Sequence, residues 1–168
     1  MKIIGFDPAP KNFGFAEMHI HKSKKGSYLE IVKLGYLANM IPSSCNEKDV
    51  VAFNSELAGI IEGADIIGFE RFKVRVARFM SGEAPELVNI MIGLLLAQRN
   101  DAVGVLASTW KKSCPEHLNV LYKKTTMKHA HIVDALCIGL FAANSIHLLQ
   151  KELGYIGESL YYAKSQLA

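Results

Sequence analysis

Two short segments far apart in this chain share one design, and that design restricts the fold more than any other feature of the sequence. Residues 3–7 read IIGFD and residues 66–70 read IIGFE. β-Branched and aromatic residues at this density favour buried strands. Each segment ends on an acid, Asp7 or Glu70. A buried carboxylate costs free energy unless it is paired, hydrogen-bonded or bound to a cation, although Asp7 on its own could also cap the turn at Pro8.

A third acid, Asp134, stands inside the apolar, helix-like run HIVDALCIGL at residues 131–140. Three acids at the edges of core segments suggest one cluster where those segments meet. Carboxylates so placed repel one another, which makes a hard divalent cation their natural counter-charge. His131 lies three residues before Asp134, on the same face of one helix, and could ligate a metal or carry a proton near neutral pH.

The length of 168 residues predicts a single domain over residues 1–168. Half of the residues are hydrophobic and 21% are charged, which indicates a globular protein. Cys45, Cys114 and Cys137 form no Cys-x-x-Cys pair, so we expect reduced thiols, with Cys137 in the core. No secretory leader or membrane-length apolar run is visible, and we expect a soluble, cytoplasmic protein.

Two basic stretches adjoin the proposed acids. The first contains Arg71, Lys73, Arg75 and Arg78, and the second contains Lys111, Lys112, Lys123, Lys124 and Lys128. A solvated face is the usual explanation of such runs. Their position beside the acids favours contact with a polyanionic ligand instead.

The remaining pattern predicts a mixed α/β order. We expect strands at residues 2–8, 13–21, 28–37, 64–70 and 103–106, and helices at 49–63, 83–98 and 127–152, with a further short helix near 155–168. The first three strands would form an antiparallel meander, and the crossover helix would make the fourth strand parallel to the first. A five-stranded mixed sheet of this kind, three antiparallel strands then two parallel, flanked by helices, is the arrangement of the ribonuclease H-like fold.

The predicted helix at 83–98 is apolar nearly all round, with Gly93 at its middle. Such a helix is either wholly buried or shared with another subunit, and we favour a homodimer contact through residues 85–98. His19 and His21 would face one side of a strand. With no third ligand near them, an exposed sheet face is a better interpretation than a zinc site.

Three segments together resemble the signature segments of RuvC-type Holliday junction resolvases: GFDPA at 5–9, GFE at 68–70 and HIVDAL at 131–136. The resemblance implies a homodimer that binds a four-way DNA junction and cuts two opposing strands with Mg²⁺ or Mn²⁺, two ions per subunit. It also implies that Asp7, Glu70, Asp134 and His131 are the metal ligands. Ala9 replaces a usual glycine, and the segment between Trp110 and Lys128 is short, as in a divergent, phage-borne member.

Phosphodiester hydrolysis by two ions about 3.5–4 Å apart assigns roles to the neighbouring residues. Asp7 would bridge the ions, and Lys124 or Lys128 would neutralise the scissile phosphate. Lys111 and Lys112 would hold the DNA backbone, although each lysine could also be a solvated surface residue. Phe72 could stack on bases of an opened junction or pack on the next helix. Trp110 is interpreted as core or dimer packing.

Other functions stay open at this point. A ribonuclease H-like nuclease could instead cut RNA–DNA hybrids or branched and flap DNA, and would not need dimer symmetry. A non-catalytic nucleic-acid-binding module of the same fold would gain nothing from acids that repel phosphate. An actin-like ATPase would need a second glycine-rich phosphate loop and a longer chain, and neither is present.

Overall fold

The structure is a computed structural model that describes residues 1–24, 26–42, 44–71, 83–113, 127–146 and 148. Its strands are β1 (Lys2–Asp7), β2 (Gly14–Ser23), β3 (Gly26–Tyr36), β4 (Ile66–Arg71) and β5 (Val103–Leu106). Its helices are α1 (Glu47–Ile61), α2 (Glu83–Gln98), α3 (Ala107–Ser113) and α5 (Met127–Ala142). The sheet order is β3-β2-β1-β4-β5. β1, β2 and β3 pair antiparallel, and β4 is parallel to both β1 and β5, which confirms the predicted mixed sheet.

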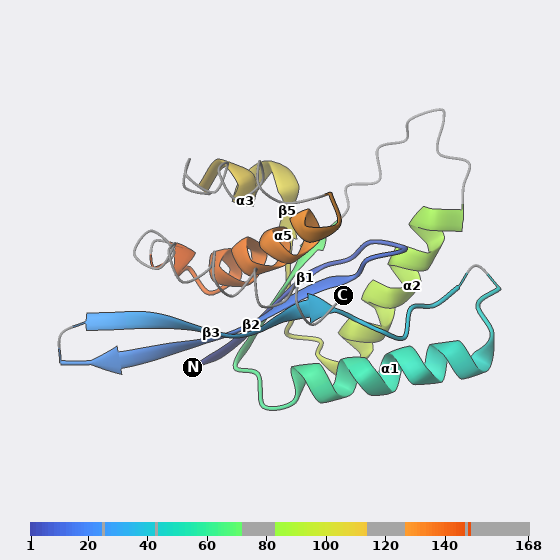
Figure 1. The fold of residues 1–168 in the computed structure, drawn as a ribbon, viewed down its shortest axis with the longest axis horizontal. Coiled ribbons are helices and arrows are strands. Elements are labelled where there is room, and N and C mark those ends of the chain that lie inside the picture. The colour runs from blue at the N-terminus through green and yellow to red at the C-terminus, as the bar shows by residue number, and fades with distance from the viewer. Residues whose placement is uncertain (25, 43, 72–82, 114–126, 147, 149–168) are drawn as a thin grey trace.

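Helices cover both faces of the sheet, with α3 and α5 on one side and α1 and α2 on the other (Figure 1). Successive residues of a strand point to opposite faces, so β1 contributes to two cores. Ile3 belongs to the core under α5, whereas Ile4 and Phe6 belong to the core against α1 and α2. This alternation also sends Asp7 to the α5 side.

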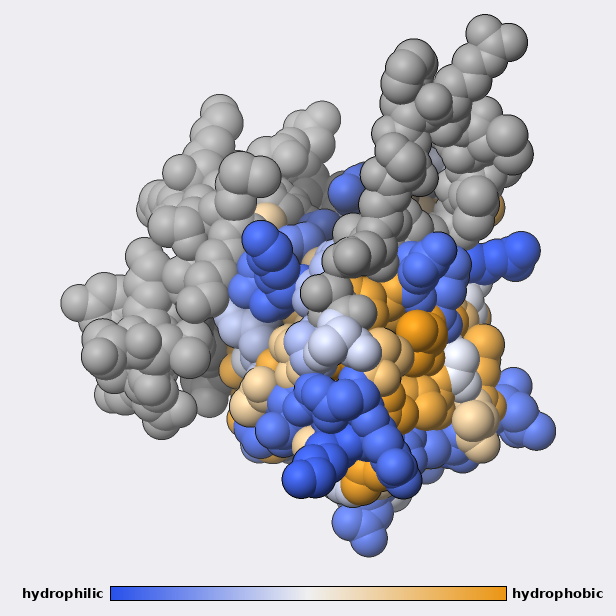
Figure 2. Space-filling view, turned by 90° about the vertical axis from the view of Figure 1, so that its right-hand side faces the viewer, coloured by the Kyte–Doolittle hydropathy of each residue, from blue (hydrophilic) through white to orange (hydrophobic). Residues whose placement is uncertain are grey.

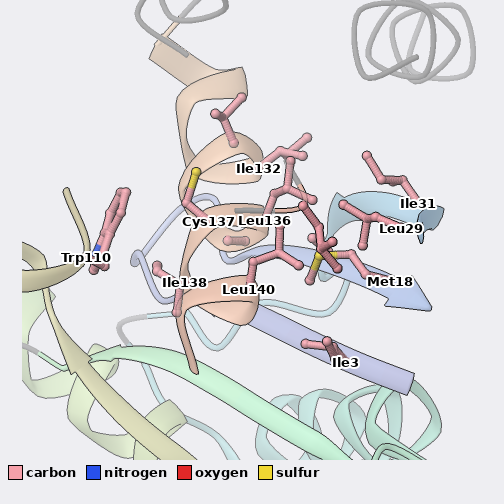
Figure 3. Close-up of a cluster of buried hydrophobic side chains, with 14 of the residues drawn as sticks. Ile3, Met18, Leu29, Ile31, Trp110, Ile132, Leu136, Cys137, Ile138 and Leu140 are labelled. Carbon is pink, nitrogen blue, oxygen red and sulfur yellow. The ribbon is translucent and has the colours of Figure 1, made fainter. Parts of the chain in front are cut away.

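Figure 3 shows how α5 is fastened to the sheet: its apolar side chains pack against Met18 of β2 and against Leu29 and Ile31 of β3. Leu136, Cys137 and Leu140 of α5 have at most 1% of their surface exposed. Burial of each of the two leucine side chains contributes about 1.5–3 kcal/mol. Cys137 and Trp110 lie in this core, as predicted.

Glycines let α5 lie directly on the two central strands. A Cβ atom at Gly5 would overlap the carbonyl oxygen of Ala135, and one at Gly68 would lie 2.7 Å from the Cβ of Ala142. On the helix itself, a Cβ at Gly139 would lie 2.9 Å from the Cα of Gly5. The glycine of the repeated IIGF segment is therefore required by the close approach of helix and sheet.

Several element ends differ from the sequence prediction. α5 ends at Ala142, not at residue 152: Asn144 takes a left-handed conformation (φ 51°), and the amide of Ser145 bonds the carbonyl of Leu140. α3 was not expected as a helix. α1 begins two residues earlier than predicted, where the side chain of Asn46 accepts a hydrogen bond from the amide of Asp49. The predicted helix near 155–168 lies outside the described residues.

α2 buries one face and exposes another. Leu87, Val88, Met91 and Leu95 are buried, whereas Ile90 and Leu96 are exposed. Figure 2 shows a hydrophobic area on the side of the molecule where α2 lies. Within the described ranges, no helix has the length and apolar character needed to cross a membrane.

Candidate active site

The predicted acids meet at one end of the sheet, on the side that α5 covers. Phe6 of β1 pairs with Phe69 of β4 in the parallel ladder, so Asp7 and Glu70 are the next residues along two adjacent strands. Burial raises the pKa of Glu70, and the charges of Asp7 and Asp134 raise it further, so both of these carboxylates act on Glu70. Three segments far apart in sequence therefore supply one acidic cluster.

His131 of α5 is held by Asp7. Its Nδ1 lies 2.6 Å from Asp7 Oδ2, a distance at which an imidazole N–H donates to a carboxylate. This hydrogen bond is the main reason that the pKa of His131 is raised, and partial burial opposes it. Asp7 itself is only 4% exposed. Its ladder partner Gly14 makes the contact possible, because a Cβ there would lie 2.5 Å from the carbonyl oxygen of His131.

Glu70 is bound by a residue that the sequence did not assign to the site. Trp110 Nε1 donates a hydrogen bond to Glu70 Oε2 at 3.0 Å. Burial is the largest cause of the raised pKa of Glu70, followed by the charge of Asp7, while the bond from Trp110 acts in the opposite direction. β5 is parallel to β4, and α3 follows β5 directly, so Trp110 lies near the C-terminal end of β4, where Glu70 is.

Lys111 places a cation at the rim of the same cluster. Its Nζ lies 3.7 Å from Asp134 Oδ2 and 5.0 Å from the centre of the Trp110 ring. Its side chain is 54% exposed, so the ammonium remains open to solvent. α3 therefore brings both a donor for Glu70 and a cation for Asp134 to the site.

Tyr36, at the end of β3, is a further neighbour that the sequence did not indicate. It pairs with Gly14, which in turn pairs with Asp7 across the next strand. Burial and then the charge of Asp7 raise the pKa of Tyr36 to about 12, so its phenol stays protonated at neutral pH. Only the strand register brings this residue to the site.

The donor set suits a hard divalent cation. Carboxylate oxygens with one imidazole are ligands that Mg²⁺ and Mn²⁺ accept. The described side chains of this cluster do not, however, bring three ligand atoms within 4.8 Å of one another. Glu70 is hydrogen-bonded to Trp110 and Asp134 is paired with Lys111, so each of these two carboxylates has a partner other than an ion. The residue types present fit such an ion, and Asp7, Glu70, Asp134 and His131 are the ones that would hold it.

The predicted DNA-contacting residues are only partly described. Arg71 ends β4 and is exposed, and Lys111 and Lys112 are exposed on α3. Lys128 lies in the first turn of α5. Phe72, Lys73, Arg75, Arg78 and Lys124 lie outside the described residues.

Comparison with known proteins gives a likeness in fold. No protein-family model matches the chain, and no curated protein matches its sequence. RuvC from Thermus thermophilus, solved in complex with a Holliday junction substrate, superposes with a TM-score of 0.59 at 12% identity, covering 83% of this chain and 91% of RuvC. Another structure of Thermus thermophilus RuvC superposes with a TM-score of 0.55 at 14% identity, covering 83% of this chain and 92% of RuvC.

The yeast mitochondrial Holliday junction resolvase gives a TM-score of 0.52 at 14% identity, covering 95% of this chain and 83% of its own. All three matches span most of both chains and agree with the mixed sheet described above. This chain therefore has the ribonuclease H-like fold in the form seen in RuvC and the mitochondrial Holliday junction resolvase.

Proposed function

We propose that this protein is a divalent-metal-dependent endonuclease that resolves four-way DNA junctions by paired phosphodiester hydrolysis. The observation that carries the proposal is the meeting of Asp7, Glu70, Asp134 and His131 at the end of the central strands. The fold supports it, since the similar solved structures are junction resolvases and one of them holds a Holliday junction substrate. Proteins of one fold carry out different reactions, so the activity follows from the residues of the site.

In this proposal Asp7, Glu70, Asp134 and His131 would hold Mg²⁺ or Mn²⁺, two ions per subunit, and Asp7 would be a ligand of both. When bound, such ions supply a water nucleophile near neutral pH and stabilise the attacking and leaving oxygens. The chain itself fixes the ligands: Trp110 orients Glu70, and His131 and Asp7 orient each other. His131, with its raised pKa, can also hold a proton close to neutral pH.

Basic residues around the site would hold the DNA backbone. Exposed Arg71, Lys111 and Lys112 lie at or beside the carboxylate end of the sheet. The same role is proposed for Lys73, Arg75, Arg78, Lys124 and Lys128, and stacking on unpaired bases is proposed for Phe72. Lys124 or Lys128 would act on the scissile phosphate.

A homodimer would match the symmetry of the substrate. The four strands of a four-way junction form two opposing pairs, and paired cuts in one pair need two active sites related by a twofold axis. The exposed apolar residues Ile90 and Leu96 of α2 support this helix as the contact. The hydrophobic area in Figure 2 lies on the same side of the molecule.

A cleavage assay on matched substrates tests the proposal. Labelled four-way, flap, duplex and RNA–DNA hybrid substrates are incubated with the protein and Mg²⁺ or Mn²⁺, with EDTA and Asp7→Asn as blanks. We expect symmetric cuts in two opposing strands of the junction and much slower cleavage of the other substrates. Faster cleavage of the RNA–DNA hybrid or the flap would show that the junction is not the preferred substrate. Binding without cutting any substrate would identify a non-catalytic module.

A further inference from the structure

A second group of possible metal ligands lies on the β2–β3 hairpin. His19, His21 and Glu30 each offer a ligand atom, and these atoms lie within 4.8 Å of one another. It is the one such group of three among the residues that the structure describes. The two histidines had no third ligand in the sequence around them, and that expectation was wrong because Glu30 pairs directly with His19 across the hairpin.

Of two distances between ligand atoms in this group, one is shorter and one is longer than the distance between ligand atoms around a zinc ion. His21 Nε2 lies 2.6 Å from Glu30 Oε2, and His19 Nδ1 lies 4.0 Å from the same oxygen. Tetrahedral Zn²⁺ with ligands at about 2.0–2.1 Å places ligand atoms about 3.3 Å apart. Small side-chain rotations would therefore bring both histidines and the carboxylate to coordinating distance.

The surroundings orient the two imidazoles. Tyr28 stacks on His21, with ring centres 4.8 Å apart and planes 15° from parallel. His19 Nε2 is buried and makes no hydrogen bond to any described residue, although Glu17 Oε1 lies 3.5 Å away. His21 and Glu30 are respectively 39% and 50% exposed, so an ion and a water molecule can reach them.

This group is separate from the acidic cluster. His19 pairs with Lys2 at the start of β1, whereas Asp7 lies at its end, about 16 Å further along the strand. It also lies on the other face of the sheet. Met18, which precedes His19, and Ile20, which lies between the two histidines, pack into the core under α5, and successive residues of a strand point to opposite faces. The hairpin reaches beyond α1 in Figure 1, which leaves this face uncovered by that helix.

We propose that His19, His21 and Glu30 bind one Zn²⁺ ion, with water in the fourth position. Two imidazoles and one carboxylate are a ligand set that zinc accepts, and they are less suited to Mg²⁺, which prefers oxygen. The ion would join β2 to β3 where the hairpin extends past α1. This site does not depend on nuclease activity, and its test does not use cleavage.

Metal titration of the full-length protein tests the site. EDTA-treated, dialysed protein is titrated with Zn²⁺ against a chromophoric chelator, and with Co²⁺, whose visible absorption reports its ligands and geometry. We expect one equivalent of tightly bound metal, and a loss of affinity of at least about tenfold in His19→Gln, His21→Gln and Glu30→Gln. Asp7→Asn and Glu70→Gln should keep this equivalent, and so should Cys45→Ser, which removes an exposed thiol.

Two further observations keep the result unambiguous. Thermal unfolding in EDTA shows whether each variant is folded, and histidine NMR signals of the wild-type protein show which rings respond to substoichiometric Zn²⁺. Shifts confined to two histidines, lost with His19→Gln or His21→Gln, would support the site. Unchanged affinity in Glu30→Gln would overturn it. If Asp7→Asn or Glu70→Gln no longer bound one equivalent of metal tightly, the ion would be bound at the acidic cluster and the proposed site would be overturned.

Discussion

Asp7 combines deep burial with a negative charge, and its neighbours show how the molecule accommodates it. His131 donates to one of its oxygens at 2.6 Å, which offsets part of the cost of removing the carboxylate from water. The same charge raises the pKa values of Glu70 and Tyr36. A site arranged this way is destabilising without a cation, as binding sites often are.

Neutralising Glu70 should therefore stabilise the metal-free protein. Glu70→Gln keeps an acceptor for Trp110 and removes a charge that Asp7 and Asp134 repel. Because the folded pKa of Glu70 lies above its ordinary value of 4.5, the wild-type protein loses stability as pH rises through that folded pKa. In EDTA we expect a higher Tm for the variant at pH 7–8 and no difference near pH 4.

Thermal unfolding of both proteins across this pH range provides the measurement. A variant that is less stable than wild type at pH 7–8 would show that burial and repulsion of the Glu70 charge do not destabilise the metal-free protein. Addition of Mn²⁺ should narrow or reverse the difference, since only the wild-type protein keeps the full ligand set.

The sequence indicated some residues of the site and missed others for a physical reason. Asp7, Glu70 and Asp134 stand out because an acid within an apolar run needs an explanation. Trp110 and Tyr36 look like ordinary core aromatics, and only the placement of α3 and the register of β3 bring them to the cluster. Glu30 was missed similarly, since its partner lies across a hairpin.

At the scale of elements, the contact between α5 and the sheet determines where His131 and Asp134 lie. Gly5, Gly14 and Gly68 remove side chains where the helix backbone meets the strands. The contact is closest to the chemistry at Gly14, which faces the backbone of His131. A shift of the helix here would move His131 away from Asp7.

Gly14→Ala should therefore lower both stability and activity. Its Cβ would lie 2.5 Å from a backbone oxygen that cannot rotate away, and overpacking of this kind costs about 1–3 kcal/mol. Gly59→Ala is the matched control, because a Cβ on this exposed position of α1 would meet nothing within 4 Å. Alanine in a helix is favoured over glycine by about 1 kcal/mol.

Urea unfolding of the two variants measures the contrast. We expect a lower midpoint for Gly14→Ala and an equal or higher midpoint for Gly59→Ala. Equal urea midpoints for the two variants would show that α5 can move away from residue 14 without loss of stability.

The spacing of apolar residues along the sequence largely predicted which segments are helices and which are strands. It did not predict where some of these elements end. α2 and β5 match their predicted bounds, since their apolar patterns stop abruptly. α5 stops at Ala142 because Asn144 adopts a left-handed conformation, which leaves little trace in an apolar sequence. α3 has only seven residues, too few for a helical period to be visible.

At the scale of the whole molecule, the two helical layers leave part of the apolar surface of α2 exposed. Ile90 is 38% exposed, and a Cβ at Gly93 would meet no atom within 4 Å. Exposed apolar surface that adjoins a buried helix face is typical of subunit contacts. The order of strands and helices was predictable from the sequence, but the occupant of this surface depends on a second chain.

Ile90→Glu should separate the proposed homodimer into folded subunits. A charge at the centre of an apolar contact is desolvated without a partner, whereas the isolated subunit holds it in water. Val32→Glu is the control, because Val32 is 47% exposed on β3, which is an edge strand of the sheet. Sedimentation should give a dimer for wild type and Val32→Glu and a monomer for Ile90→Glu. A wild-type monomer at tens of micromolar, or a dimeric Ile90→Glu, would contradict the contact.

Junction cleavage by the individual carboxylate variants, measured beside junction binding, tests whether hydrolysis occurs at the acidic cluster. Asp7→Asn, Glu70→Gln and Asp134→Asn should each cut at least about 100-fold more slowly, the scale expected when one preorganised charged group is removed. Binding should change little, and Glu47→Gln, on the exposed first turn of α1, should cut like wild type. Undiminished cutting by all three variants would show that hydrolysis does not occur at this cluster.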